Sequence, residues 1–338
     1  MNSANPRSTT PYVSVIIPAH NEERHIGKCI DSVMKTGWPR EMLELLVIDH
    51  SSTDRTAKLA HAEGARVLSV STGKIGSVRN AGLAAAKGEY VAYVDGDCSV
   101  PATWLQAAIG LLQSDESIGA VGGPCLSPTD GTWVERSLAP SSIEPGLARR
   151  VKAIATSSFI ARTSLLRDIG GFDESLISGE DDDMSNRIRS RGLALVSTSD
   201  CHIVHHGYPQ TWQDVLTKEI WHGSHHIEVR TEFDLTLILT FFFLLASIAV
   251  LALTVTAALS PGPKSFYALA VSLFLQFVPP SLLAAKRVRQ SQHDWRLIPP
   301  LLAVGYAYFI GHSFGVLANL WRPATSHVQR RTTADSDN

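Results

Sequence analysis

The sequence has no block of lysine or arginine, and it has few cysteines. The formal net charge is -2 over 338 residues, so the chain has no electrostatic footprint for nucleic acid, and we expect any nucleotide that it binds to be a small ligand. The four cysteines are widely scattered and form no C-x-x-C pair, a pattern that indicates neither a zinc ribbon nor a disulfide framework. A reducing cytoplasm is therefore the simpler setting for the soluble part of the chain.

Two further absences divide the chain. Residues 1–11 are polar and contain no apolar core of signal-peptide length, so we expect a polar tail and no cleaved export signal. Acidic residues almost disappear in the C-terminal third, where the charged residues of 235–320 are only Lys264, Lys286, Arg287, Arg289, Asp294 and Arg296. The sequence therefore predicts a soluble domain over 12–230, a membrane domain over 235–321 and a polar tail over 322–338.

Three uncharged stretches lie in the membrane domain, at 235–259, 266–285 and 297–320. Each is close to the roughly 20 residues that cross a bilayer core, and we predict about three transmembrane helices. The alternative is a set of buried helices in a large soluble core. Pro279 and Pro280 interrupt the middle stretch, which favours a kinked or re-entrant segment there.

The distribution of basic residues predicts an orientation. The linker 286–296 is basic, whereas the loop 260–265 has one lysine, and the positive-inside rule then places the soluble domain and this linker in the cytoplasm. We therefore expect a multi-pass protein of the cytoplasmic (inner) membrane with its soluble domain, and any catalytic site in it, facing the cytoplasm. Three full crossings would put the C-terminal tail outside, although the tail carries Arg322, Arg330 and Arg331. This conflict counts against the third crossing.

The soluble domain alternates short apolar β-branched runs with segments of helical periodicity. This alternation predicts an α/β fold with a mostly parallel sheet covered by helices. Ligands of such sheets bind outside the carboxyl ends of the strands, and polar residues follow three predicted strands there, at 18–22, 49–54 and 95–97. We therefore expect one ligand to contact all three segments.

The first of these segments lacks glycine. A dinucleotide-binding Rossmann domain would need G-x-G-x-x-G in this turn, but residues 18–22 read Pro-Ala-His-Asn-Glu. A P-loop is also absent from the chain. A nucleotide must therefore be held in another way.

Two carboxylates separated by one glycine, Asp95 and Asp97, close an apolar strand. Carboxylate oxygens suit Mg²⁺ or Mn²⁺, which commonly reach a protein through one or two carboxylates and the phosphates of the substrate. A solvated acidic turn is the alternative. The two aspartates are nevertheless the first candidates for a metal site.

A second acidic cluster, Glu180-Asp181-Asp182-Asp183, precedes a helical pattern over 184–191. Acids at a helix N-terminus can simply complement the macrodipole. However, four crowded carboxylates should raise one another's pKa, which suits a general base. We therefore favour a catalytic carboxylate in this cluster.

Basic and histidine side chains supply weaker signals. Lys74 and Arg79 lie about one helix before Asp95 and could meet a pyrophosphate, although isolated cations are usually only solvated. A short predicted strand ends in His205 and His206. The alternatives there are a polar strand end and a histidine that completes a metal shell or contacts phosphate, and the spacing does not decide between the two histidines.

Together these segments resemble glycosyltransferase family 2, a group of inverting sugar transferases with a GT-A fold. The resemblance covers roughly residues 12 to 230, in this order: 13–23, 46–54, 79–82, 88–97, 170–174 and 179–183. Any one match is weak, whereas six in order are specific. The resemblance implies that a nucleotide-diphosphate sugar is the donor and that Mn²⁺ or Mg²⁺ is the cofactor.

The resemblance also implies roles for the matched residues. The nucleotide-sugar site would consist of Pro18, Ala19, Asn21, Glu22, Asp49 (at the base), Lys74 and Arg79 (near ribose or diphosphate) and Asp95. Asp97 would hold the metal, and Asp181, paired with Glu180, would be the catalytic base. It would take the proton of an acceptor hydroxyl during in-line attack on the anomeric carbon while the metal stabilises the departing diphosphate.

The chain departs from the family pattern at two places. His50 replaces a second acid after Asp49, and residues 218–223 lack the Q-x-x-R-W signature of processive members, which favours single transfers. The segment 121–150, rich in Gly, Pro and Ser, is interpreted as a loop that supplies much of the acceptor selectivity.

The C-terminal membrane segments resemble those of bacterial transferases that build exopolysaccharide or other envelope glycans on polyprenyl-linked carriers. We therefore expect a lipid-linked or glycan acceptor at the membrane. A transferase that makes a polyprenyl-phosphate sugar or a glycolipid directly is one alternative. A degenerate domain that serves as a membrane scaffold is another, and the retention of Asp95, Asp97, Glu180 and Asp181 counts against it.

Overall fold

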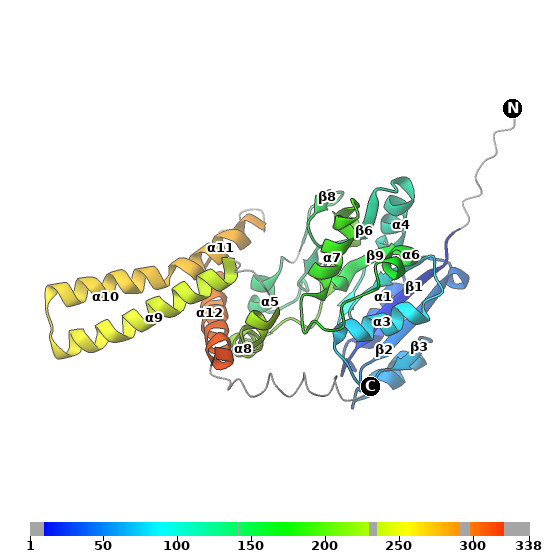
Figure 1. Ribbon diagram of the computed structural model, residues 1–338. Coiled ribbons are helices and arrows are strands. Elements are labelled where there is room, and N and C mark those ends of the chain that lie inside the picture. The colour runs from blue at the N-terminus through cyan, green and yellow to red at the C-terminus, as the bar shows by residue number, and fades with distance from the viewer. Residues whose placement is uncertain (1–9, 141, 230–234, 291–297, 321–338) are drawn as a thin grey trace, which may run out of the picture. The chain divides into compact units, whose positions relative to one another are not determined.

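The computed structural model describes residues 10–140, 142–229, 235–290 and 298–320 (Figure 1). The chain forms two compact units. Unit 1 contains residues 1–130 and 139–208, and unit 2 contains residues 131–138 and 209–338.

An eight-stranded sheet forms the centre of unit 1, in the order β3-β2-β1-β4-β9-β6-β10-β8. The strands β3, β2, β1 and β4 run parallel, and β6 is parallel to β10, whereas β9 and β8 are antiparallel to their neighbours. The sheet is therefore mostly parallel, which confirms the predicted fold class. The strand bounds are β1 Val13–Ala19, β2 Leu43–Asp49, β3 Arg66–Ser69, β4 Tyr90–Tyr93, β6 Ile118–Gly122, β8 Ala148–Val151, β9 Phe159–Arg162 and β10 Ala194–Thr198.

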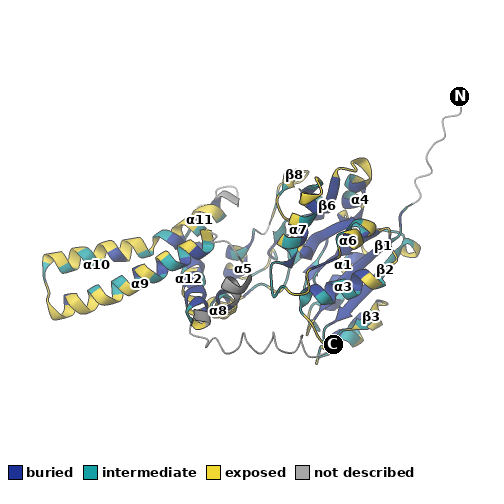
Figure 2. Cartoon of the chain, viewed as in Figure 1, coloured by how far each residue is buried: buried dark blue, intermediate teal, exposed yellow. Residues whose placement is uncertain are grey.

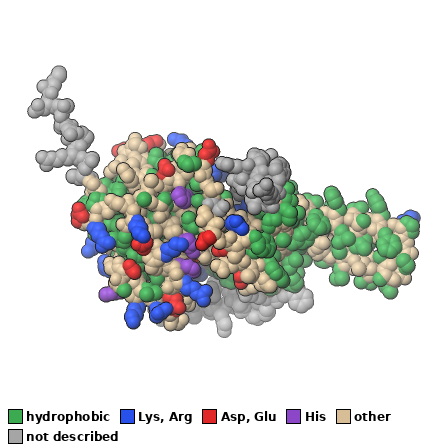
Figure 3. Space-filling view, turned by 180° about the vertical axis from the view of Figure 1, so that it is seen from behind, with side chains coloured by type: hydrophobic (Ala, Val, Ile, Leu, Met, Phe, Trp, Pro, Cys, Tyr) green, Lys and Arg blue, Asp and Glu red, His purple; other side chains and the backbone are tan. Residues whose placement is uncertain are grey.

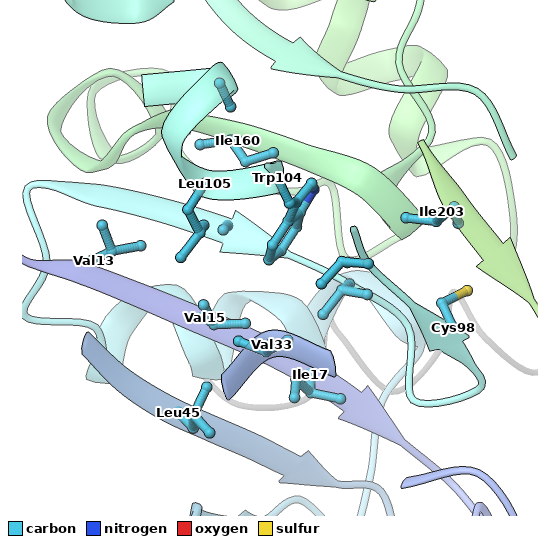
Figure 4. Packing of buried hydrophobic residues seen from close by; sticks show 14 of the residues in the cluster. Val13, Val15, Ile17, Val33, Leu45, Cys98, Trp104, Leu105, Ile160 and Ile203 are labelled. Carbon is cyan, nitrogen blue, oxygen red and sulfur yellow. The ribbon is translucent and has the colours of Figure 1, made fainter. Parts of the chain in front are cut away.

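Helices cover both faces of this sheet because each strand sends alternate side chains to opposite sides. Val15 and Ile17 of β1 belong to one buried cluster, which includes Trp104 (Figure 4), whereas Ile16 belongs to the other. Both clusters are almost free of solvent (Figure 2). The helices are α1 Ile26–Met34, α2 Thr56–Ala62, α3 Ile75–Ala85, α4 Trp104–Ser114, α6 Thr163–Asp168 and α7 Glu180–Ser190, with short 3₁₀ turns at Arg40–Met42, Thr156–Ser158 and Ser199–Cys201.

A small three-stranded sheet, in the order β5-β11-β7, brings distant residues together. Its strands are β5 Cys98–Ser99, β7 Cys125–Leu126 and β11 Ile203–His205. In the antiparallel pair of β5 and β11, His205 lies opposite Cys98. The end of β11 is thereby placed beside the acidic turn that precedes β5.

Unit 2 is helical. Its helices are α5 Trp133–Leu138, α8 Trp212–Val229, α9 Leu235–Leu259, α10 Pro263–Gln276, α11 Val278–Gln290 and α12 Ile298–Leu320. By length and composition, three segments could cross a membrane, namely Leu235–Leu259, Pro263–Val288 and Ile298–Ala318. Exposed hydrophobic side chains cover α9 and α10 (Figure 3).

The first compact unit ends at Tyr208, and α8 packs with α12 in unit 2. Two elements differ from the sequence-based predictions. Helix α7 begins at Glu180 rather than at residue 184, since acids in the first turn are favourable at a helix N-terminus. The predicted loop 121–150 contains β7, α5 and β8, which are too short to show periodicity. The predicted break at the two prolines lies where α10 ends and α11 begins.

Candidate active site

Two loops at the carboxyl ends of β1 and β2 are joined by Asn21. This residue has a positive φ of 57°, and its Oδ1 accepts a hydrogen bond from the backbone N–H of Thr53 at 2.8 Å. The backbone N–H of Asn21 donates to Oγ of Ser52 at 2.9 Å, and that of Glu22 donates to Oγ1 of Thr56 at 2.7 Å. Asn21 and Glu22, expected to line a nucleotide pocket, therefore also fix the shape of both loops.

Asp49 ends β2 beside these loops. In the parallel register of β1 and β2, Ala19 lies opposite Asp49, and Pro18 lies opposite the preceding residue. The Asp49 side chain is 6% exposed, and its Oδ1 has no hydrogen-bond partner among the described residues. A buried acceptor without a donor is unfavourable unless a ligand supplies one. Pro18, Ala19 and Asp49 therefore lie together at a position that favours an N–H or O–H donor.

Arg79 of α3 binds two carboxylates from different parts of unit 1. Its Nη1 donates to Oε1 of Glu180 at 2.5 Å, and its Nη2 donates to Oδ1 of Asp95 at 3.1 Å. Arg79 is 4% exposed, and its guanidinium carbon lies 5.8 Å from the centre of the Phe172 ring. The sequence placed Arg79 near ribose or diphosphate, but this buried guanidinium is already occupied by two carboxylates. We expect it to position them rather than to meet the diphosphate.

Asn80, next to Arg79, holds the segment 170–174. Its Nδ2 donates to the backbone oxygen of Phe172 at 2.9 Å and to Oε1 of Glu174 at 2.8 Å, and its Oδ1 accepts from the backbone N–H of Phe172 at 2.8 Å. Lys74, expected near the phosphates, donates to the backbone oxygen of Ser175. Asn80 and Phe172 lie in the segments 79–82 and 170–174, which resemble the family pattern, but the sequence alone indicated no role for either residue.

Asp181 and Glu180 stand in the first turn of α7 but in different surroundings. Glu180 is buried against Arg79, whereas Asp181 is half-buried and its Oδ1 accepts from the backbone N–H of Asp182 at 2.9 Å. Burial raises the pKa of Asp181 above its usual value, and the nearby Glu180 carboxylate adds to the rise. The crowding of carboxylates that the sequence suggested is thus the smaller cause of the pKa rise of Asp181. In the same turn, the carboxylate of Asp183 is neutralised by Arg187 at 2.6 Å.

Asp97 lies beside His205. The distance from Oδ2 of Asp97 to Nε2 of His205 is 3.4 Å, and the ring of Tyr208 lies 4.5 Å from that of His205. Nδ1 of His205 is buried and has no hydrogen-bond partner among the described residues. Gly207 leaves this site open, because a Cβ there would collide with the Asp97 carboxylate. An oxygen and a nitrogen donor therefore meet at one place, an arrangement that suits a divalent transition metal.

Two neighbours of Asp97 are weaker candidates for metal ligands. Sγ of Cys98 lies within 4.8 Å of the other two donors, but burial raises the pKa of this thiol above its usual value, which disfavours the thiolate that binds a metal. His206 lies with Nε2 3.0 Å from Oγ of Ser99, and its ring stacks on that of His25. Between the two histidines that the sequence left open, the geometry favours His205.

Glu22 lies at the same end of unit 1. Its Oε2 is 3.1 Å from Nδ1 of His25, and burial raises the pKa of its carboxyl, a rise that the Asp97 carboxylate increases. A Cβ at Gly96 would lie 3.3 Å from Cγ of Glu22. The turn between Asp95 and Asp97 therefore packs directly on the β1 loop, and the predicted nucleotide and metal residues share one region.

Comparison with known proteins shows which families the chain resembles. The sequence pattern of the family described as glycosyl transferase family 2 matches residues 14–169. Glycosyltransferase AglE of Haloferax volcanii is 31% identical over 233 residues, which cover 66% of this chain and 75% of AglE. The poly(ribitol-phosphate) beta-N-acetylglucosaminyltransferase TarS of Staphylococcus aureus is 30% identical over 177 residues, which cover 50% of this chain but only 30% of TarS.

A solved structure shares the fold. Mannosyltransferase PcManGT from Pyrobaculum calidifontis, in complex with GDP-Man and Mn²⁺, matches with a TM-score of 0.57 and 20% sequence identity, over 93% of this chain and 88% of that one.

The buried Arg79 bridge gives a testable prediction for stability. Replacing Arg79→Met leaves two carboxylates without their cation, and we expect the free energy of unfolding to fall by roughly 3–5 kcal/mol. Denaturant unfolding of the detergent-solubilised protein, followed by tryptophan fluorescence, measures this change. The matched control is Arg55→Met, which removes an exposed ion pair with Glu23 and should cost at most about 1 kcal/mol. Equal effects of the two substitutions would contradict the structural role of Arg79.

Proposed function

The chain belongs to glycosyltransferase family 2, and we propose that it transfers a sugar from a nucleotide-diphosphate donor to a membrane-associated acceptor with inversion at the anomeric carbon. The observation that carries this proposal is the bridge from Asp95 through Arg79 to Glu180. It joins the acidic turn, where a donor would bind, to the first turn of α7, where Asp181 stands. A donor site and a proton acceptor are thus held in one rigid cluster.

The donor would bind at the carboxyl ends of β1, β2 and β4. The unpaired buried Oδ1 of Asp49 would accept a hydrogen bond from an N–H of the nucleotide base, and the loops fixed by Asn21 would surround the nucleotide. GDP-Man is bound by the structural neighbour PcManGT, and the name of TarS describes an N-acetylglucosaminyl transfer. Both support a nucleotide sugar here, without deciding which sugar or base.

A divalent cation would be held by Asp97 and His205, which fit it through their oxygen and nitrogen donors and the space that Gly207 leaves. Two protein ligands are few, as is usual for an ion that also binds the phosphates of a substrate. When bound, the ion would act as a Lewis acid for the departing diphosphate. Because imidazole suits transition metals better than Mg²⁺, we propose Mn²⁺ as the preferred ion.

Asp181 would be the general base. Its carboxylate is half-buried and is not ion-paired, unlike that of Glu180, so it is free to accept the proton of an acceptor hydroxyl as the oxygen attacks. Its raised pKa makes it a better proton acceptor than an ordinary aspartate. Glu180, predicted together with Asp181 as catalytic, would instead act through Arg79 as a positioning residue.

The acceptor would be lipid-linked or part of an envelope glycan. Helices that could cross a membrane follow the catalytic unit, and an enzyme held at the bilayer surface needs to search only that surface for a lipid-linked acceptor. We propose that the protein resides in the cytoplasmic membrane with the catalytic unit on the cytoplasmic side, where the basic linker 286–296 would also lie. A polyprenyl phosphate that accepts the sugar directly is the second candidate, since a phosphate needs no general base.

Replacing Asp181→Asn tests the base. We expect the rate of transfer to fall by roughly 10²–10⁴-fold, with the nucleotide affinity unchanged. The wild-type rate should rise with pH along a limb whose midpoint lies above the ordinary aspartate pKa of about 3.9, because the pKa of Asp181 is raised. Steady-state kinetics between pH 4.5 and about 8 measure both effects.

The unfolding temperature distinguishes a general-base role of Asp181 from a structural role. A carboxyl with a raised folded-state pKa contributes less to stability as pH rises through that pKa, so Asp181→Asn should leave the neutral-pH unfolding temperature unchanged or higher. Asp182→Asn, in the same turn but exposed, is the matched control and should retain its activity. Full activity of Asp181→Asn would contradict the base and favour a phosphate acceptor.

The metal site predicts a difference between two histidines. We expect His205→Ala to weaken Mn²⁺ binding by at least roughly 10–100-fold, because a loss of that size occurs even when a residue that only hydrogen-bonds to a metal ligand is replaced. The substitution His206→Ala should change Mn²⁺ binding little. The electron paramagnetic resonance signal of free Mn²⁺, titrated with protein and nucleoside diphosphate, measures binding without requiring turnover. A larger loss in His206→Ala than in His205→Ala would overturn this assignment.

A further inference from the structure

Helix α12 is long and apolar enough to cross a membrane, but it differs from α9 in its surroundings. Within unit 2, protein covers 56% of the apolar window of α12, compared with 11% for α9. The exposed positions of α12 fall in one narrow stripe along the helix, formed by Pro299, Ala303, Ile310, Phe314 and Ala318. A helix of this kind presents only one edge to lipid.

Helix α8 packs along α12 through glycines. A Cβ at Gly311 would lie 2.6 Å from the backbone oxygen of Leu216, and one at Gly315 would collide with the backbone oxygen of Ile220. The contact advances by four residues in both helices, so α8 and α12 run side by side in the same direction over about a turn or more. His312 of α12, 2% exposed, faces Glu219 of α8, with Nδ1 and Oε2 3.5 Å apart.

This pairing gives both helices the same depth in a membrane. Asp214 and Lys218 of α8 are exposed in unit 2, and charged side chains in the hydrocarbon region are unfavourable. Trp212 and Trp221, also exposed, are typical of the membrane–water interface. If α12 crossed the bilayer, it would carry the charged face of α8 into the hydrocarbon.

Helix α5 also indicates that α12 does not cross the bilayer. Its Val134 packs with Val304 and Ala307 near the middle of α12, and with Val215 of α8. The chain enters α5 from unit 1 and returns to unit 1 directly after it, at residues 130 and 139. A segment tied at both ends to a catalytic unit cannot reach the middle of a helix that stands across a bilayer.

Helices α9 and α10 form a hairpin with different properties. They lie side by side (Figure 1), and Nε2 of Gln276 donates to Oγ of Ser247 at 2.9 Å. Tyr306 of α12 meets this hairpin at Phe243 and Phe277, with ring centres 5.9 and 5.1 Å apart. Figure 1 shows α12 crossing the base of the hairpin rather than running along it.

The part of the hairpin beyond this contact has the length and surface for insertion. Residues 244–259 span about 24 Å as a helix. An interfacial α12, from which this part of α9 would start, would itself lie about 5–10 Å deep in the bilayer. The two lengths together reach the roughly 30 Å of a bilayer core. Leu245, Leu251 and Leu259 are 66%, 68% and 79% exposed in unit 2. The described residues leave most of each of these side chains uncovered.

We propose that α12 lies in the plane of the membrane surface with α8, in contact with lipid headgroups and the upper acyl chains, and that α9 and α10 are the two crossings. Two crossings return the chain to the side of the catalytic unit. The linker 286–296 and the basic tail with Arg322, Arg330 and Arg331 then lie on one side, which removes the conflict that three crossings create with the positive-inside rule. This proposal goes beyond the transfer reaction and does not depend on it.

Spin labels test the depth of α12. Single cysteines would be placed on its exposed stripe (Ala303→Cys, Ile310→Cys, Phe314→Cys and Ala318→Cys), with the parental chain as the blank for the native cysteines. The full-length protein is reconstituted in phosphatidylethanolamine–phosphatidylglycerol vesicles, and power saturation with oxygen and a water-soluble nickel chelate gives each depth. Leu245→Cys and Val255→Cys on α9 are the matched controls for a crossing helix.

The two arrangements predict different depths. An in-plane α12 gives four similar depths near the interface, whereas the two α9 labels differ by about 15 Å. A crossing α12 would separate the labels at 303 and 318 by about 22 Å along the bilayer normal, and that result would overturn the proposal.

A second measurement uses sidedness. An impermeant maleimide applied to intact spheroplasts should label Ser260→Cys but not a cysteine added after Asn338, and inverted vesicles should give the opposite pattern. Labelling of the C-terminal cysteine in spheroplasts would also overturn the proposal. Neither measurement depends on transfer activity, so failure here is distinguishable from failure of the proposed function.

Discussion

The buried guanidinium of Arg79 determines how the catalytic unit is organised. It neutralises Asp95, which follows β4, and Glu180, which begins α7 and lies 101 residues further along the chain than Arg79. The buried carboxylate of Glu180 and the half-buried carboxylate of Asp95 would repel each other without this cation. Asn80, the next residue, fixes the segment 170–174 through Phe172. One short stretch of α3 therefore sets the relative positions of the strand ends and of α7.

This constraint gives nearby carboxylates different tasks. Asp95 and Glu180 are neutralised by Arg79, Asp97 lies against His205, and Asp49 remains buried with an unpaired oxygen. Asp181 has no ion-pair partner among the described residues, and burial raises the pKa of its carboxyl. In the proposed function, groups of the same chemical type would thus serve for positioning, metal binding, recognition of a nucleotide base and proton transfer because their surroundings differ.

The sequence predicted the fold class and the segments of the site, because strand alternation and acidic turns are local patterns. It could not predict that Arg79 is buried, since the partners that bury it are distant in sequence. The choice between His205 and His206 required the pairing of β5 with β11. Helix α5 was missed within 121–150 because six residues show no periodicity. The packing of α12 was also beyond prediction, because hydropathy reports composition and not which helix lies alongside.

We propose that this unit activates a nucleotide sugar with a divalent cation. The most direct measurement is the release of nucleoside diphosphate from a panel of UDP-, GDP- and dTDP-sugars by the detergent-purified protein with Mn²⁺ or Mg²⁺, with Asp97→Ala as the comparison. We expect metal-dependent release from one class of donor by the wild type and its loss in Asp97→Ala. No release from any donor, even with membrane lipid extract added as a source of acceptor, would contradict donor activation by this unit and favour a scaffold without transferase activity.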